Sequence, residues 1–291
     1  MLTRLKISGF KSLVDVDVSF GPFTCIAGAI GVGKSNLFDA IRFLGLLANS
    51  TFAEAAATIR DEEGKTGDIR TLFHRRGDEI LPTMKFEAEI LIPRFGMDDL
   101  NLPAEASIIF LSYRLELAPR DPGEGPSPNP IRLIREELDR INLAGAYEHL
   151  AFDLNRREWG RSVLFGRRTS PFVSTHVEDG ECRIKLRQDG LRGRPRAYLA
   201  SELPRTIISG VNAAESPTAL IAKREMQAWR LLQLKPSALR NSDDFLARPG
   251  LDAKGDHLPA TLHHLSRKSA RQEEPKNGNS RFFESIFRKA V

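Results

Sequence analysis

The amino-acid sequence predicts an α/β fold, with a mixed sheet, an antiparallel β-subdomain and a helical part. Three observations predict this class. Residues 1–20 and 84–117 contain segments in which apolar and polar residues alternate, which is typical of half-buried strands. A short apolar run at 23–27 leads through a glycine-rich stretch into apolar residues at helical spacing. Residues 217–234 show that helical spacing again.

The first twenty residues predict a β-hairpin. Leu5 and Ile7 alternate with polar neighbours, and the valines and phenylalanine over 14–20 alternate in the same way. Residues 9–12, Gly-Phe-Lys-Ser, form the expected turn between the two strands. A third, buried strand is expected over 23–27 because that run is short and apolar.

The segment after this third strand carries the most specific motif. Residues 28–36 read GAIGVGKSN and match the G-x-x-x-x-G-K-[ST] pattern of phosphate-binding loops at four positions: Gly28, Gly33, Lys34 and Ser35. Glycines let such a loop curl so that backbone N–H groups point at phosphate oxygens, and the following helix adds its positive N-terminal end. We expect the lysine to reach the β- and γ-phosphates and the serine hydroxyl to ligate Mg²⁺. The alternative is a glycine-rich turn that binds no ligand.

Further strands, helices and loops follow the glycine-rich segment. Periodicity and turn residues predict, in order, a helix over 35–48, helical continuation over 50–59, a loop over 60–68, strands over 84–92 and 108–117, a helix over 131–141, short strands over 163–165 and 182–187, and a helix over 217–234. Ser216 is expected to cap the last of these helices, with Pro217 at its first position.

Composition shifts along the chain suggest four parts. These are an N-terminal lobe with the glycine-rich loop over 1–118, a Pro/Gly-rich linker over 119–130, a helical and β insertion over 131–265, and a polar tail over 266–291. The tail ends in a short amphipathic segment over 282–287.

The overall composition is ordinary for a soluble globular protein. The chain has 291 residues, a net charge of +5 and no apolar stretch close to the ~20 residues that cross a bilayer. Its first residues lack a signal-peptide core. Cys25 and Cys182 are the only cysteines, and the first falls in the expected buried strand, so a disulfide framework is not expected. We therefore expect a cytoplasmic protein that contacts no membrane.

The basic excess of the chain is concentrated in one region. Arg and Lys clearly outnumber Asp and Glu over 156–196. Such a patch suits the phosphate backbone of DNA or another nucleic acid. Two alternatives are a solvated arginine-rich surface and a surface for an acidic protein partner.

The opening residues resemble the ATP-binding heads of the SMC, RecF and OLD-nuclease group, within the ABC-type AAA ATPases. The shared pattern is a strand, a Gly-Phe-Lys-Ser turn, a second strand ending in Phe, the phosphate-binding loop with Ser-Asn, and a helix with Asp-Ala-Ile. This chain matches the pattern at 5–12, 14–20, 28–36 and 39–41. A thinner similarity to OLD-like ATPases of phage defence extends over 68–73, over the strands at 84–92 and 108–117, and over 229–240.

The resemblance implies a phosphate-loop fold of the ABC-ATPase head type, with ATP and Mg²⁺ as cofactors. In that group, two heads bind two ATP molecules between them. This ATP-driven dimerisation moves an attached element that acts in DNA repair or phage defence. The positions that match the nucleotide site are Gly28, Gly31, Val32, Gly33, Lys34, Ser35, Asn36, Lys11 and Ser12, with Ser35 as the metal ligand. The alternative for Lys11 is an exposed turn lysine. The chain departs from the group at Ile30, where a polar Asn is usual.

Two elements of the resembled group are missing from the sequence. No apolar strand ends in the Asp-Glu pair that would hold Mg²⁺ and activate water. No Leu-Ser-x-Gly signature is visible, and Ile208-Ser209-Gly210 is only a partial match. Three explanations remain open: the chain is part of a longer one, another polypeptide supplies the catalytic lobe, or the protein binds nucleotide without efficient turnover. The catalytic residues are therefore unassigned.

Two functional hypotheses of different classes follow. The first is an ATPase head, acting as a homodimer or oligomer, that couples ATP-driven dimerisation to DNA processing or antiphage defence. The second is a nucleotide-gated scaffold that binds ATP without turnover and positions an effector nuclease or toxin. A small-molecule kinase is less favoured, because that fold does not normally open with this hairpin.

Overall fold

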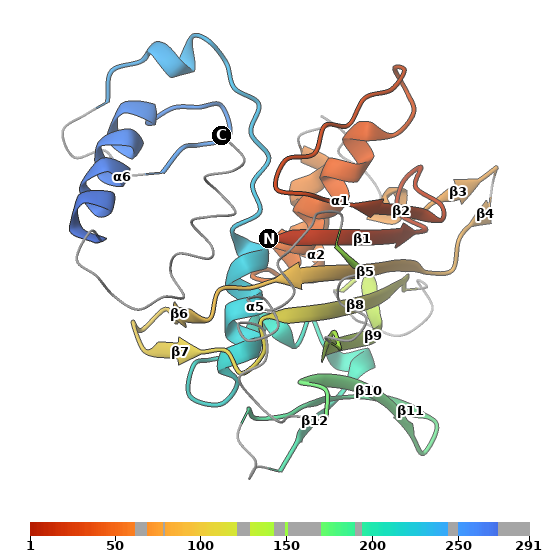
Figure 1. Ribbon diagram of the computed structural model, residues 1–291. Helices are drawn as coiled ribbons and strands as arrows, with labels where there is room; N and C mark the ends of the chain where they lie inside the picture. The colour runs from red at the N-terminus through yellow and green to blue at the C-terminus, as the bar shows by residue number, and fades with distance from the viewer. Residues whose placement is uncertain are drawn as a thin grey trace. The chain divides into compact units, whose positions relative to one another are not determined.

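The computed structural model describes residues 1–61, 69–77, 79–120, 129–142, 149–150, 170–189, 194–243 and 250–272. Two compact units divide the chain, Met1–Trp229 and Arg230–Val291. The first unit holds the large sheet and most of the helices (Figure 1). In the described part of the second, α6 (Leu258–Gln272) follows the short 3₁₀ turn at Ala238–Arg240. None of the described helices is long and apolar enough to span a membrane.

An eight-stranded sheet forms the centre of the first unit, with neighbouring strands antiparallel. Its spatial order is β12-β11-β10-β9-β8-β5-β1-β2. The strand bounds are β1 (Leu2–Ser8), β2 (Val16–Ser19), β5 (Met84–Leu91), β8 (Phe110–Pro119), β9 (Ile131–Arg140), β10 (Val173–Glu178), β11 (Glu181–Leu186) and β12 (Arg196–Leu199). Because β1 lies between β2 and β5, the predicted N-terminal hairpin is confirmed and is joined to the later strands.

Among the described residues of this unit, three α-helices accompany the sheet: α1 (Lys34–Leu47), α2 (Phe52–Asp61) and α5 (Pro217–Gln227). A cluster of three rings joins α1 to the sheet. Phe43 of α1 lies 5.6 Å from Phe10, and Phe10 lies 5.6 Å from Phe86 of β5, both measured between ring centroids. All three side chains are almost fully buried. This aromatic contact fixes the helix that follows the glycine-rich loop against the sheet.

Short elements complete the unit. They are the hairpins β3 (Arg75–Arg76) with β4 (Glu79–Ile80) and β6 (Phe95–Met97) with β7 (Pro103–Glu105), and 3₁₀ turns at η1 (Ile69–Leu72), η3 (Ala200–Glu202) and η4 (Ile208–Gly210). The α/β class and the antiparallel subdomain predicted from the sequence are confirmed by this arrangement.

The helix predicted over 131–141 is wrong, since this segment is strand β9. Its residues IRLIREELDR have helical spacing, but pairing with β8 makes them a strand. Leu133 is buried before a shift in the pairing register, and Glu136 and Leu138 are buried after it. Tertiary pairing overrides local helix preference here, as it often does for short amphipathic segments.

The strand predicted over 23–27 is also wrong, because these residues have no regular structure. Phe23 and Cys25 are exposed, which corrects the expectation of a buried cysteine. A strand needs a hydrogen-bonding neighbour, and no described strand pairs with this run. The helix predicted over 217–234 ends earlier, at Gln227.

Two further predictions are confirmed: the helical continuation after residue 50 is α2, and the strand over 182–187 is β11. Its antiparallel partner β10, over 173–178, was not predicted. The strand over 163–165 and the segment over 282–287 lie outside the described residues. The four-part division of the chain stays a prediction. Strands on both sides of the proposed linker at 119–130, β8 and β9, pair in the same sheet.

Candidate nucleotide-binding site

The glycine-rich loop curls through two left-handed backbone positions. Gly31 has φ 87° and Gly33 has φ 95°, values that side-chain-bearing residues rarely adopt. Gly33 is also the residue immediately before α1. A Cβ atom at this position would lie 3.1 Å from the Ser12 Oγ atom. Gly33 is therefore required both by its backbone conformation and by its close approach to the preceding turn.

Lys34 folds back over the loop that precedes it. Its Nζ atom donates hydrogen bonds of 2.7 Å to the carbonyl oxygens of Gly28 and Ala29. The ammonium group thus lies inside the curl of the loop, while the side chain remains only half-buried. An ammonium in this position can exchange its carbonyl partners for phosphate oxygens, which accept hydrogen bonds more strongly.

The first turn of α1 offers free hydrogen-bond donors to an anion. Gly33 supplies no side-chain cap, and the first turn contains no acidic residue. The initial N–H groups of a helix lack partners within the helix, and they carry the positive end of its dipole. Ser35 is exposed in this turn, so its hydroxyl is accessible. The loop and the helix start therefore fit a polyphosphate with its Mg²⁺ ion.

The turn at 9–12 is fastened to α1 by two side-chain contacts. Lys11 pairs with Asp39 at 2.8 Å and is almost buried. Asn36 donates a 2.6 Å hydrogen bond from Nδ2 to Ser12 Oγ. The structure thus brings four of the predicted site positions, Ser12, Gly33, Lys34 and Asn36, to one place. Direct contact of Lys11 or Ser12 with a nucleotide stays a prediction.

A segment not assigned to the site from the sequence also contacts this turn. His74 donates from its backbone N–H to the Gly9 carbonyl at 2.8 Å, and its Nδ1 lies 2.7 Å from the Lys11 carbonyl oxygen. The Lys11 N–H donates in turn to the Leu72 carbonyl at 2.8 Å. The left-handed backbone of Lys11, with φ 49°, makes these contacts possible. No motif signals this pairing, because it joins segments about sixty residues apart.

Several apolar side chains around the loop face solvent. Ile30 is fully exposed, Phe23 is 80% exposed and Val32 is 62% exposed. Ile30 therefore points away from the curl, and its departure from the usual Asn leaves the backbone donors in place. Exposed apolar side chains gathered along one stretch are typical of a surface that another protein segment covers.

Comparison with known proteins finds a similarity in the N-terminal segment. A family model described as an AAA domain matches residues 4–81, which include the hairpin, the loop and α1. This matched stretch is called the AAA segment. The match extends to β4, so the turn contacts made by Leu72 and His74 lie within the AAA segment.

One curated relative and one solved structure extend this comparison. The chain is 28% identical over 185 residues to the DNA replication and repair protein RecF of Paenarthrobacter aurescens (strain TC1). The alignment covers 60% of this chain and 44% of that RecF, so the chain spans less than half of the relative's length. A structure reported under ATP-driven dimerisation and DNA-stimulated activation of SMC ATPases is 20% identical and covers 54% of this chain and 74% of its own. Its TM-score of 0.30 is too low to establish a common fold.

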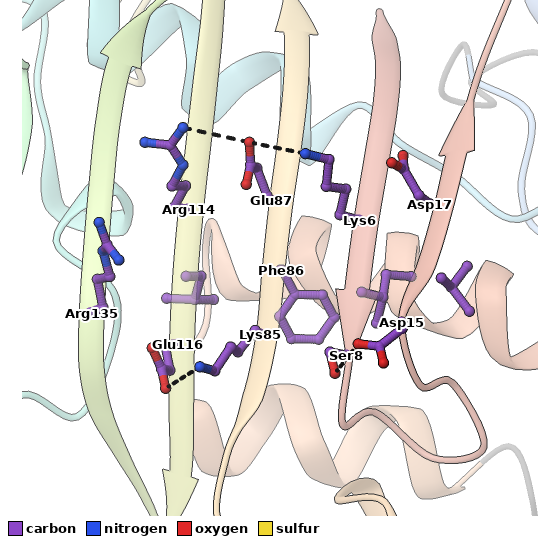
Figure 2. A pocket seen from close by; sticks show the side chains of 13 residues that line it. Lys6, Ser8, Asp15, Asp17, Lys85, Phe86, Glu87, Arg114, Glu116 and Arg135 are labelled. Carbon is purple, nitrogen blue, oxygen red and sulfur yellow. Dashed lines mark hydrogen bonds and ion pairs between the residues drawn. The ribbon is translucent and has the colours of Figure 1, made fainter.

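A shallow groove on the exposed face of the sheet is separate from the glycine-rich loop (Figure 2). Charged side chains alternate in sign across its strands. One row of cross-strand neighbours runs Asp17, Lys6, Glu87, Arg114 and Glu137. Glu87 lies 3.9 Å from Lys6 and 3.5 Å from Arg114. Because these charges pair with one another, we interpret this face as a row of solvated ion pairs and not as a phosphate-binding site.

The described part of the basic region over 156–196 is largely paired. Arg183 lies 2.9 Å from Glu181, Lys185 pairs with Glu178, and Arg196 pairs with Glu215. Much of the region lies outside the described residues. Its contact with DNA stays a prediction.

Among the described residues, no three His, Cys, Asp or Glu side chains gather as a metal site would need. The partial signature Ile208-Ser209-Gly210 is the 3₁₀ turn η4, with Ile208 and Ser209 buried. Buried side chains cannot face a nucleotide held by a second molecule, so this segment is not a signature loop in the present fold.

Proposed function

We propose that the AAA segment binds ATP with Mg²⁺ and acts as the nucleotide-binding lobe of a RecF- or SMC-like ATPase. The observation that carries this proposal is the curl formed by Gly31 and Gly33, which places the Lys34 ammonium inside the loop at an uncapped helix start. The family match over 4–81 supports the same assignment.

Each loop position has a distinct role in this proposal. Backbone N–H groups from Gly31 to Asn36 bind phosphate oxygens, with Gly28 and Val32 completing the curve of the loop. Lys34 neutralises the β- and γ-phosphates, and Ser35 offers its hydroxyl to the metal. When bound, Mg²⁺ would neutralise phosphate charge. Lys11 and Ser12 hold the first turn of α1 in place through Asp39 and Asn36.

Hydrolysis requires a carboxylate, and the sequence has no apolar strand that ends in the Asp-Glu pair. Asp39, the acid of α1, is paired with Lys11. We propose that a complementary lobe, from a longer chain or from a second polypeptide, supplies a carboxylate-bearing strand beside residues 23–27. The exposed apolar side chains of that run support the proposal, because a neighbouring strand would bury them.

The biological process follows by analogy with the relatives. RecF is named for DNA replication and repair, and the SMC study is titled for ATP-driven dimerisation and DNA stimulation. We propose ATP-dependent homodimerisation coupled to DNA processing, with residues 156–196 as the DNA contact. Phage defence and an effector nuclease or toxin partner belong to the second candidate, a scaffold that binds ATP without turnover. The missing carboxylate is what favours that candidate.

Ligand-induced stabilisation tests the proposed function. A ligand that binds only the folded state raises the melting temperature, by an amount that grows with its concentration over Kd. We expect Mg·ATP to raise the melting temperature of the full chain and Mg·AMP to have little effect, because AMP lacks the β- and γ-phosphates. Lys34→Ala should abolish the shift. Lys6→Ala removes a lysine from the groove on the exposed face of the sheet, and this variant should keep the shift in melting temperature. An equal shift in both variants would overturn the assignment.

A further inference from the structure

Five consecutive residues, Thr206–Gly210, receive polar contacts from three different elements. The segment comprises Thr206, Ile207 and the 3₁₀ turn η4. Thr206 and Ser209 are buried, although both are polar. Buried polar groups need partners, so the bonds that satisfy this segment determine its position.

Strand β9 contacts the segment through a buried carboxylate. Glu136 Oε2 accepts the Ile207 N–H at 2.6 Å, and Oε1 accepts the Ile208 N–H at 3.0 Å. The Tyr113 hydroxyl of β8 donates to Oε1 at 3.2 Å. Both carboxylate oxygens are thereby used, and the backbone of Glu136 is itself fixed by two 2.9 Å bonds with Thr175 Oγ1.

Helix α1 contacts the segment at its last turn. The Thr206 hydroxyl donates a 2.8 Å hydrogen bond to the carbonyl oxygen of Leu47, the final residue of the helix. The last carbonyls of a helix have no partner within it. Thr206 therefore completes the end of α1 opposite to the nucleotide loop. Nearby, the Phe52 N–H that begins α2 donates to the Pro204 carbonyl at 3.0 Å.

Helix α5 contacts the segment through a buried ammonium. Lys223 Nζ donates a 2.7 Å hydrogen bond to the Ser209 carbonyl. Lys223 is 6% exposed, and this burial lowers the pKa of its ammonium. The Ser209 hydroxyl donates in turn to the Thr206 carbonyl at 2.7 Å, so the contacts from α5 and α1 meet within the segment.

We propose that residues 206–210 form a mechanical joint that couples β9 and α5 to the C-terminal end of α1. Two buried ionisable groups, Glu136 and Lys223, both bond to the backbone of one short segment, and leaving either without its hydrogen-bond partners would cost free energy. If the segment is displaced, β9 and α5 must therefore move with it. Because Thr206 continues the same network to Leu47, the displacement reaches the helix that begins at Lys34.

Amide hydrogen exchange on the full chain without nucleotide tests the joint, independently of whether ATP binds. In Glu136→Gln, the amide cannot accept from both N–H groups. We expect exchange to become at least about fivefold faster at residues 206–208 and also at 44–48, which Glu136 does not touch. Glu137→Gln is the matched control, since Glu137 pairs with Arg135 on the exposed face. It should leave 44–48 unchanged.

A second variant covers the case in which Glu136→Gln fails to fold. Thr206→Val keeps the side-chain volume and removes only the hydroxyl, so exchange should quicken at 44–48 while the amides of β1 and β5 stay protected. Combining both substitutions should add little at 44–48 beyond either one alone, because both break the same path. Faster exchange confined to 206–208 in Glu136→Gln, or unchanged exchange at 44–48 in Thr206→Val, would overturn the proposal.

Discussion

Single residues in this chain owe their roles to position more than to type. Lys34 matters because it starts a helix and lies inside a loop curl, 2.7 Å from two carbonyl oxygens. Lys11 carries the same charge, yet it is held by Asp39. The motif predicts the first role from sequence. It does not predict the second, because the Asp39 partner is found only after α1 and the hairpin turn come together.

Loss of the Lys34 ammonium should remove both binding and turnover. If the chain, alone or with its complementary lobe, releases phosphate from ATP, Lys34→Ala should lower that rate by at least about a hundredfold, since transition-state charge on the phosphates loses its main cation. Steady-state phosphate release measures this. Lys6→Ala should retain the wild-type rate, and a Lys34→Ala variant that did the same would exclude the loop as the site.

Glu136 should make stability depend on pH. Burial raises the pKa of its carboxyl to about 7, against the donors from Ile207, Ile208 and Tyr113, which lower it. The folded state therefore holds a proton that the unfolded chain releases above pH 4.5. Stability falls as pH rises from about 4.5 to 7, by a few kcal/mol at most.

Urea unfolding between pH 4.5 and 8 checks this titration. The difference in unfolding free energy between wild type and Glu136→Gln should change across the window, because Gln does not titrate. The same difference taken for Glu137→Gln should stay nearly flat, since Glu137 is partly solvated and paired with arginines. A flat difference for Glu136→Gln would show that the buried carboxyl does not titrate there.

At the scale of elements, helix α1 depends on a close approach to α5. Gly45 lies in the last turn of α1, and a Cβ atom there would be 2.9 Å from the Met226 carbonyl oxygen. An alanine gains about 1 kcal/mol of helix propensity over glycine. The backbone contact leaves no room for the methyl group, so overpacking outweighs that gain.

Gly45→Ala should therefore destabilise the protein. We expect the free energy of unfolding to fall by about 1–2 kcal/mol, as measured by chemical denaturation. Gly210→Ala is the matched comparison, because a Cβ atom there meets nothing within 4 Å. It should change stability by no more than about 0.5 kcal/mol. A stabilised Gly45→Ala variant would mean that α1 and α5 can separate without cost.

Elements were predictable from sequence where local pattern and pairing agree. The N-terminal hairpin and β5 alternate cleanly and were predicted, as was α1 with its glycine-rich start. Residues 131–140 have helical spacing, and only pairing with β8 made them a strand. Residues 23–27 had the composition of a buried strand, but no described strand pairs with them. The contact of His74 with the 9–12 turn is non-local and had no sequence signal.

At the scale of the whole molecule, the loop side of the AAA segment and the groove on the sheet present different surfaces. The chain spans less than half of its RecF relative. The loop side of the AAA segment presents exposed apolar side chains. In the groove on the sheet, by contrast, Glu87 forms ion pairs with Lys6 and Arg114. These contrasting surfaces indicate that a protein partner would meet the loop side first.

DNA binding, if it uses the 156–196 region, should be strongly salt-dependent. Neutralised phosphates release counterions, so the logarithm of affinity falls linearly with the logarithm of salt concentration. Fluorescence anisotropy with a short duplex measures the slope. Replacing the exposed Arg194 by alanine should reduce the slope by about one if this residue contacts a phosphate. Binding that is insensitive to salt, or a slope unchanged in several such variants, would remove DNA from this surface.

Isothermal titration calorimetry of the folded full chain with Mg·ATP tests the central claim most directly. We expect saturable binding heat at one site per chain. This heat should be lost in Lys34→Ala and retained in Lys6→Ala. An absence of heat from correctly folded wild-type protein, or the same heat from Lys34→Ala, would contradict it.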